Sequence, residues 1–174
     1  GNANVFTGGG TVTITEAKLE GASADIVLKA ENSVTVSGTF NQDTNGEGTG
    51  AILRLANDID LTIQTNNSTG ASAGIDLTGV TVEVQTQGDG KFDFKTGVDG
   101  TAGGLAPIVV GTLKTLGDSP FKGGITLNAE GSVTTGALTT GGSTNATGAI
   151  DIDAGDGVTI NGALTTGDAS DGDS

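Results

Sequence analysis

Apolar and polar residues alternate with a period of two in several short segments of this chain. The pattern is clearest over residues 24–36, 123–138 and 148–164, where apolar side chains mostly recur at every second position. Such alternation predicts half-buried β-strands, because successive side chains of a strand point to opposite faces. No segment has convincing helical periodicity. We therefore expect an all-β protein.

The same apolar template recurs along the chain. "ADIVLKAENSVTVSGTF" (24–40), "GGITLNAEGSVTTGALTTG" (123–141) and "GAIDIDAGDGVTINGALTTG" (148–167) place Ile, Leu, Val and Ala at matching positions. "AILRLANDIDLTI" (51–63) gives a further copy, in which the apolar positions fall 25 residues after those of the first. Repetition of this kind is typical of a solenoid, in which each repeat packs on its neighbours.

Each copy is expected to contain two short strands, a tight break and a polar loop rich in Gly and Thr. Residues 75–84 form a shorter copy, Phe92 and Phe94 begin a looser one, and Val12 and Ile14 belong to an incomplete first copy. One copy cannot bury its apolar stripe alone, so the copies must stack. We expect the stack to align Ile26, Ala51 or Leu53, Ile75, Ile125 and Ile150 in one core.

Two architectures fit this pattern. In a right-handed parallel β-helix each copy is one coil, and about six to seven coils would make a rod of about 30 Å. An antiparallel β-sandwich also has short strands with turn signals, but its strands need not repeat one template at a fixed distance. The repeat favours the β-helix. We expect one domain over residues 1–174, with residues 95–122, which include both prolines, as an irregular coil or loop insert.

Residues 123–174 resemble the repeats of large secreted exoproteins of the filamentous haemagglutinin type, most closely those of cyanobacteria. The resemblance is carried by "GGITLNAEGSVTTGALTTG" and "GAIDIDAGDGVTINGALTTGDAS", and is weaker over residues 24–84. It implies a right-handed parallel β-helix, export by two-partner secretion, and a role in adhesion at the surface of a Gram-negative-type bacterium. The N-terminal secretion domain of that family is not recognisable in this sequence.

The charge of the chain excludes several partners. It has 21 acidic and 7 basic residues, a net charge of −14 and a pI near 4.1. Nucleic acid needs a basic face, and so does an anionic membrane surface. The sequence contains no Cys, which excludes disulfides and thiolate metal sites, and no apolar run long enough to span a bilayer.

The two ends of the β-helix raise the question of partners. An open end exposes unpaired backbone groups, and no amphipathic helix that would cover either end is evident in the sequence. We therefore expect either further coils of the same chain or identical subunits stacked head to tail. Surface glycans are a further possible partner.

Residues that would support catalysis are scarce. The sequence has no His, Cys or Tyr, and Arg54 is its only arginine. The acidic pairs Asp58 with Asp60 and Asp151 with Asp153 resemble the carboxylate pairs of glycoside hydrolases. Each pair alternates with apolar residues, which indicates that both members face outward on one strand. A solvated acidic surface is the favoured interpretation.

Two other features suggest ligands. Asp151, Asp153 and Asp156 in "DIDAGDG" offer oxygen ligands of the kind that Ca²⁺ prefers, although the spacing is not that of an EF-hand and turn chemistry is favoured. No other cofactor is expected. Stacked threonines are predicted to stiffen one face, or to bind glycan or ice: Thr134, Thr135, Thr139, Thr140, Thr159, Thr165 and Thr166. Asn66 and Asn145 lie in glycosylation triplets, which arise by chance in such sequences.

These features predict a secreted, structural or adhesive β-helix that forms part of a surface fibre or filament. The alternative is a module that binds glycans or another surface. An enzyme acting on polysaccharides has the least support.

Overall fold

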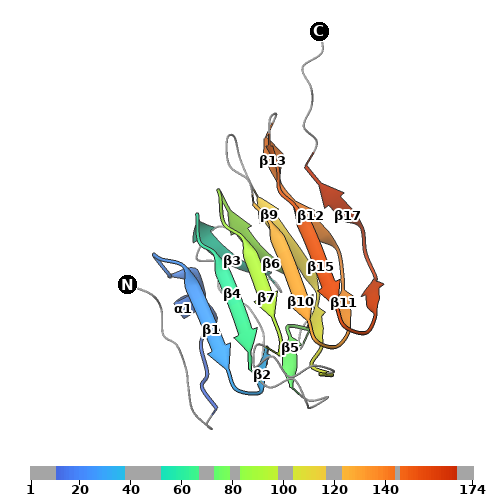
Figure 1. Cartoon of the computed structure of the whole chain (residues 1–174). Coiled ribbons are helices and arrows are strands. Elements are labelled where there is room, and N and C mark those ends of the chain that lie inside the picture. Colours follow the sequence, from blue (N-terminus) through green and yellow to red (C-terminus); the bar gives the residue numbers. More distant parts are fainter. Residues whose placement is uncertain are drawn as a thin grey trace.

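The computed structural model describes residues 11–37, 52–66, 73–78, 83–97, 104–116, 123–143 and 146–167. They form a right-handed parallel β-helix in which the chain passes through three sheets in turn (Figure 1). Each sheet has five strands, so five coils stack in the described part of the chain, fewer than the six to seven expected. The parallel pairing excludes the antiparallel sandwich.

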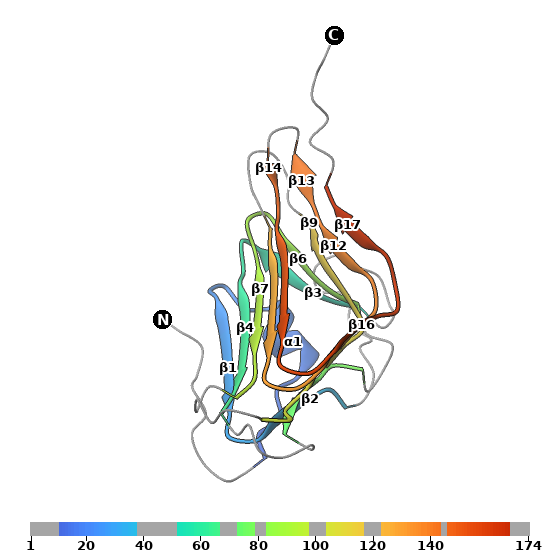
Figure 2. The same ribbon diagram turned by 45° about the vertical axis from the view of Figure 1, so that its right-hand side comes forward.

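The sheets, named A, B and C in the order in which a coil visits them, enclose a triangular prism (Figure 2). Sheet A contains β1 (Ile26–Ala30), β4 (Leu61–Thr65), β7 (Phe92–Lys95), β10 (Ile125–Ala129) and β15 (Ile150–Ala154). Sheet B contains β2 (Ser33–Thr35), β5 (Gly74–Asp76), β8 (Ile108–Val110), β11 (Val133–Thr135) and β16 (Val158–Ile160). Sheet C contains β3 (Ile52–Asn57), β6 (Glu83–Gln87), β9 (Thr112–Leu116), β12 (Leu138–Thr140) and β17 (Leu164–Thr166).

Each coil therefore has three strands where the sequence suggested two. In the last two coils the third strand lies in the "ALTT" segment, which ends both copies of the apolar template. Leu138 and Leu164 point inward in this strand and pair in register. A short antiparallel hairpin, β13 (Gly142–Ser143) and β14 (Ala146–Thr147), extends from the corner that follows β12.

Ile26, Ile125 and Ile150 share one column of sheet A as expected, whereas Leu53 and Ile75 do not belong to it. Ile125 pairs with Ile150, 25 positions on, as expected. Ile26, however, pairs with Leu61, whereas Leu53 lies in sheet C and Ile75 in sheet B. Ala51 lies outside the described residues. Alternation is the same in all three sheets, so spacing alone cannot assign a strand to its sheet when the loops differ in length.

The region from Phe92 to Leu116 is more regular than expected. Phe92 and Phe94 are 1% and 0% exposed in β7, and pair with Ile125 and Leu127 of the next coil. Within the expected irregular insert, 95–122, residues 108–110 and 112–116 form β8 and β9 in sheets B and C. That expectation is wrong for 108–110 and 112–116, while residues 98–103 and 117–122 lie outside the described residues.

A short helix, α1 (Glu16–Glu20), covers part of the N-terminal end of the prism and packs against β3 (Figure 2). Leu19 of this helix and Ala22, which lies after its end, contact the core. The absence of helical periodicity was thus misleading, because five residues are too few to show it. Val12 precedes this helix and is 53% exposed instead of forming a strand.

The core is a continuous column of aliphatic side chains with the two phenylalanines at its centre. Burying each of these side chains contributes about 1.5–3 kcal/mol to folding. The larger apolar residues that are at most 1% exposed are Leu55, Ile75, Phe92, Phe94, Ile108, Leu113, Ile125, Leu127, Val133 and Leu138.

Glycines at the corner between sheets C and A allow the chain to pass from one sheet to the other. In three successive coils a buried threonine at the last or second-last position of the sheet C strand lies against the glycine two positions before the next sheet A strand. The pairs are Thr86 with Gly90, Thr115 with Gly123, and Thr140 with Gly148. A Cβ at any of these glycines would overlap the threonine or a backbone carbonyl of the neighbouring coil. The prism can therefore close at this corner only with glycine there.

Candidate functional site

The outer face of sheet A is the most regular polar surface among the described residues. In-register pairing aligns outward side chains in rows along the prism, with adjacent strands about 4.8 Å apart. One row contains Val27, Thr62, Asp93, Thr126 and Asp151. The other contains Lys29, Gln64, Lys95, Asn128 and Asp153.

A hollow of about 260 Å³ lies beside the first row, with Asp60, Lys91, Asp93 and Thr126 among its lining residues. Its polar groups include two carboxylates and one ammonium. Phe92 reaches the hollow but is 1% exposed, so it offers no aromatic platform to a sugar ring.

The acidic pair Asp58 and Asp60 belongs to the corner between β3 and β4. Asp58 has φ of 62° and lies in a turn, so the expectation that it occupies a strand is wrong. Its carboxylate accepts a hydrogen bond from the Asp89 N–H at 2.9 Å. The Asp60 carboxylate accepts one from the Lys91 N–H, also at 2.9 Å. Both side chains thus join one coil to the next, which is a structural use of the pair.

Asp60 also connects to the coil before it. Its own N–H donates to the Asp25 carboxylate at 3.1 Å. Partial burial raises the pKa of the Asp60 carboxyl; the Lys91 N–H acts against this rise, whereas the Asp25 carboxylate adds to it. At this corner the carboxylates of Asp25 and Asp60 therefore join the first three coils through backbone N–H groups.

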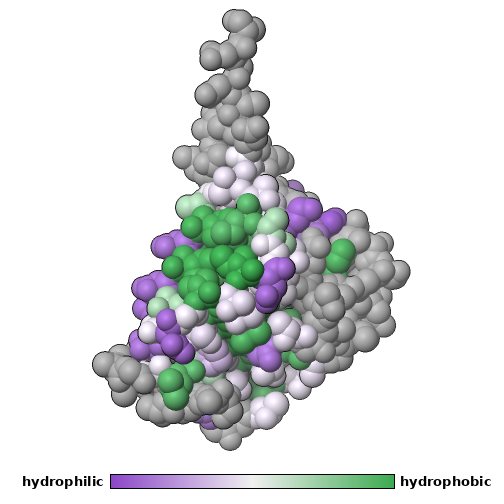
Figure 3. Space-filling model, turned by 90° about the vertical axis from the view of Figure 1, so that its right-hand side faces the viewer, coloured by the Kyte–Doolittle hydropathy of each residue, from purple (hydrophilic) through white to green (hydrophobic). Residues whose placement is uncertain are grey.

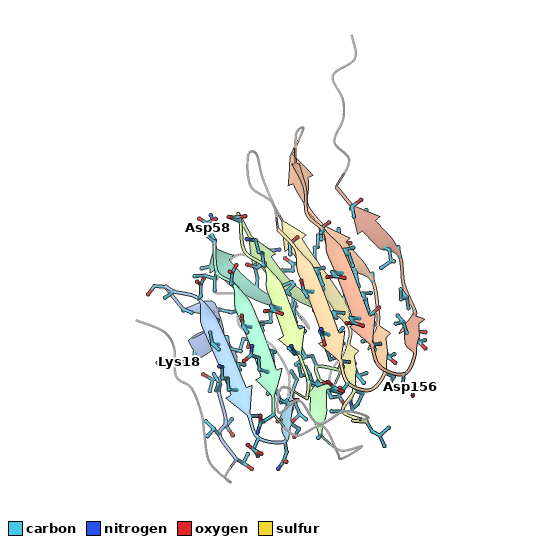
Figure 4. All side chains as sticks on the ribbon, viewed as in Figure 1. Lys18, Asp58 and Asp156 are labelled. Carbon is cyan, nitrogen blue, oxygen red and sulfur yellow. The ribbon has the colours of Figure 1, made fainter. Side chains whose placement is uncertain are left out.

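The residues of the calcium hypothesis lie at the other end of the solenoid. Asp151 and Asp153 are exposed on the outer face of β15, as the alternation predicted, and Asp156 lies in the turn before β16. Figure 4 shows Asp156 at a corner far from Asp58. Among the described residues no three acidic side chains are placed to hold a metal ion. The geometry therefore gives the calcium hypothesis no support.

The predicted threonine ladder is divided between three surfaces. Thr134 pairs with Thr159 on the outside of sheet B, and Thr139 with Thr165 on the outside of sheet C. Thr140 points inward, is 0% exposed and donates its hydroxyl to the Gly148 carbonyl at 2.8 Å. There is thus no single flat threonine face, because neighbouring residues of a strand point in opposite directions.

The glycosylation triplet at Asn66 directly follows β4. The Asn66 side-chain amide donates to both carboxylate oxygens of Glu31 at 3.2 Å, and its N–H donates to the Ala30 carbonyl. This asparagine therefore joins the first two coils. Asn145 lies outside the described residues.

Two surfaces at the ends were not identified as sites by sequence reasoning. At the N-terminal end, an apolar hollow of about 570 Å³ lies between α1 and β1, with Val12, Leu19, Ile26 and Leu28 among its lining residues. The signal for it was Val12 and Ile14, which also line the hollow and which the sequence pattern placed in an incomplete first copy of the repeat.

At the C-terminal end, β15, β16 and β17 are the last strands of their sheets. Val158, Ile160 and Leu164 are 48%, 37% and 52% exposed. Figure 3 looks onto this end and shows apolar side chains gathered there. An open end was expected from the sequence.

No helix in the described ranges is long and apolar enough to cross a membrane. Comparisons with models of protein families, with curated proteins and with solved structures gave no match for this chain. The resemblance to filamentous haemagglutinin repeats therefore stays a prediction that rests on its sequence pattern.

Proposed function

We propose that this chain is an extracellular structural or adhesive β-helix, part of a surface fibre or filament. The observation that carries the proposal is the core, which runs through all five described coils inside three in-register sheets. Each coil contacts mainly its neighbours, so the fold supplies length and stiffness. The outer surface is polar and acidic, which suits a solvated rod with a net charge of −14.

The acidic pair at Asp58 and Asp60 adds to this proposal. Its carboxylates bind backbone N–H groups of the next coil, so they hold the corners of the rod together. A hydrolase would need a free carboxylic acid and a second carboxylate facing the same substrate. An enzyme acting on polysaccharides therefore has less support than a structural element.

A second candidate function is binding to glycans or to another surface. It is favoured by the two polar rows on sheet A, which repeat similar groups at the strand spacing, and by the hollow beside Asp60 and Lys91. Repeated weak sites along a rod add to a high avidity. A glycan array probed with the fluorescently labelled chain tests this candidate, with Thr126→Lys as the variant expected to reduce binding.

The main proposal is tested by locating the protein. Antibodies raised against this chain should label intact cells of the organism that produces it, and electron microscopy should show the label on surface fibres. Labelling that requires permeabilised cells would overturn the extracellular assignment. Saturable cleavage of an acidic polysaccharide, lost in Asp60→Asn, would overturn the structural assignment.

A further inference from the structure

The two ends of the prism are unlike each other. Leu53 and Leu164 occupy the same column of sheet C at opposite ends. Leu53 is 4% exposed at the N-terminal end, where α1 packs against β3, whereas Leu164 is 52% exposed. No described residue covers the C-terminal end. Among the described residues, this end is therefore the less covered of the two.

The open end is apolar because it repeats a surface that is covered elsewhere. One coil earlier, Val133 and Leu138 occupy the columns of Val158 and Leu164 and are both 0% exposed, because the last coil covers them. Val158 and Ile160 have no such cover and are 48% and 37% exposed. Exposed clusters of this kind mark interaction surfaces.

We propose that this end binds the same end of a second copy of the chain. The interface is an antiparallel pairing of β16 with β16 of the partner subunit, with the two-fold axis at Thr159. Two-fold symmetry requires a self-complementary surface, in which each residue meets the symmetry mate of the other. This association goes beyond the proposed structural role and does not depend on it.

The backbone of β16 has the right pattern of free groups. The Gly157 carbonyl accepts from Val133 N–H, and the Asn161 N–H donates to the Thr135 carbonyl, so both face the preceding coil. Alternate residues of a strand face the same side, hence Thr159 also faces that coil, and the N–H and C=O of Val158 and Ile160 face the open end. When the pairing of the two β16 strands is centred on Thr159, Val158 lies opposite Ile160 of the partner subunit. Each such pair exchanges two hydrogen bonds.

The side chains favour β16 over its neighbours as the central strand. A pairing of β15 with itself would bring Asp151 and Asp153 of both copies together, and like charges directly opposite are destabilising. A pairing of β17 with itself would place Leu164 opposite the polar Thr166. With β16 at the centre, Val158 meets the apolar Ile160 of the partner subunit. β15 then lies beside β17 of the partner subunit, whose outward residue is the uncharged Thr165.

Head-to-tail stacking is disfavoured at the other end. The N-terminal edge of sheet C is covered by α1, and the Glu20 carboxylate accepts the Arg54 N–H at 3.4 Å. A strand of a second copy would have to displace both. The pairing we propose therefore joins two copies at their C-terminal ends, and α1 lies at the opposite end of each copy.

The first test is sedimentation of the full chain over a concentration series. We expect a species of twice the 16.8 kDa chain mass. Ile160→Lys should yield the monomer with an unchanged circular dichroism spectrum, since Ile160 is on the surface of the isolated chain. Thr126→Lys, on the exposed outer face of β10, is the matched control and should remain dimeric. A chain that stays monomeric throughout, or that associates head to tail, would overturn the proposal.

The second test fixes the register by crosslinking. The chain has no cysteine, so Thr159→Cys introduces a single thiol. Residues opposite each other at a non-hydrogen-bonded antiparallel position lie about 4.5 Å apart between Cα atoms, within reach of a disulfide. Mild oxidation should convert this variant to a covalent dimer and leave Thr165→Cys uncrosslinked. Crosslinking through Thr165→Cys alone, or through neither, would refute the two-fold axis at Thr159.

Discussion

The carboxylate of Glu20 accepts a hydrogen bond from the backbone N–H of Arg54 at 3.4 Å. Glu20 is 1% exposed and ends α1, and Arg54 lies on β3, the first strand of sheet C. The carboxylate thus occupies a place that a carbonyl of a preceding strand would take. Unpaired edges promote aggregation, so a side chain that satisfies an edge N–H protects that end of the sheet.

Removing this carboxylate should destabilise the N-terminal coil. Glu20→Ala is expected to lower the free energy of unfolding by about 1–3 kcal/mol, because hydrogen bonds to charged groups contribute about that much when buried. Hydrogen exchange at the Arg54 amide should accelerate in the same variant. Lys18→Ala, an exposed change on the same helix, is the control; an equal loss in both variants would show that helix propensity is responsible instead.

The corner glycines should be sensitive to a single methyl group. A Cβ at Gly123 would overlap the Thr115 side chain, whereas the nearest atom to a Cβ at Gly124 is the Ala149 carbonyl oxygen at 3.7 Å. Overpacking of this kind costs about 1–3 kcal/mol. Gly123→Ala should therefore lower the denaturation midpoint, and Gly124→Ala should leave it nearly unchanged. Equal midpoints for these two neighbours would contradict the closed corner.

The cost of a core truncation should depend on the coil. Ile125 and Ile150 pair in register, but Ile125 is 0% exposed and Ile150 is half-buried in the last coil. Ile125→Ala should cost about 2–5 kcal/mol, as is usual for a buried isoleucine. Ile150→Ala should cost clearly less when urea denaturation is followed on dilute samples. The reverse order would mean that the last coil is more tightly packed than the fourth.

Ionisation of Asp60 should reduce stability at neutral pH. Burial raises the pKa of its carboxyl above the ordinary value of 3.8, so the folded chain binds this proton more tightly than the unfolded chain. The resulting loss of folding stability is absent below the pKa that this carboxyl has in the unfolded chain. It develops as the pH rises through the higher pKa that the carboxyl has in the folded chain. Asp60→Asn keeps an oxygen acceptor for the Lys91 N–H and removes the charge.

Thermal unfolding of Asp60→Asn at two pH values checks this expectation. The variant should be more stable than the parent chain at about pH 7 and equal to it at about pH 3. Asp151→Asn, an exposed change on β15, serves as the control for general relief of the negative charge. A variant that is less stable at about pH 7 would show that the carboxylate stabilises this corner more than burial penalises it.

The sequence predicted the fold class because period-two alternation and repetition are direct consequences of a stacked β-core. It predicted the register between Ile125 and Ile150 because these two copies repeat the same apolar template at matching positions. It misplaced Leu53 and Ile75 because loops of unequal length separate the early strands. Alternation alone does not distinguish the three sheets.

The candidate site was harder to predict for a different reason. Asp58 and Asp60 looked like a catalytic pair by spacing, but their hydrogen bonds go to residues about one coil away, which no local pattern records. Glu20 was overlooked because its partner, the Arg54 N–H, is 34 positions distant and belongs to the backbone. Interactions between coils become visible only when the coils are assembled.

The number of residues that separates equivalent positions of the last two coils has a consequence for the gene. Ile125 pairs with Ile150, and Val133 pairs with Val158, at the same separation of 25 residues. The strands of these two coils are therefore in matching register in both sheet A and sheet B. A tandem duplication of the DNA that encodes one such unit preserves the reading frame and adds one layer without altering the cross-section. Unequal recombination between the repeats removes a layer in the same way. The length of such a rod can therefore change by recombination, in steps of one strand spacing, while its outer rows stay aligned.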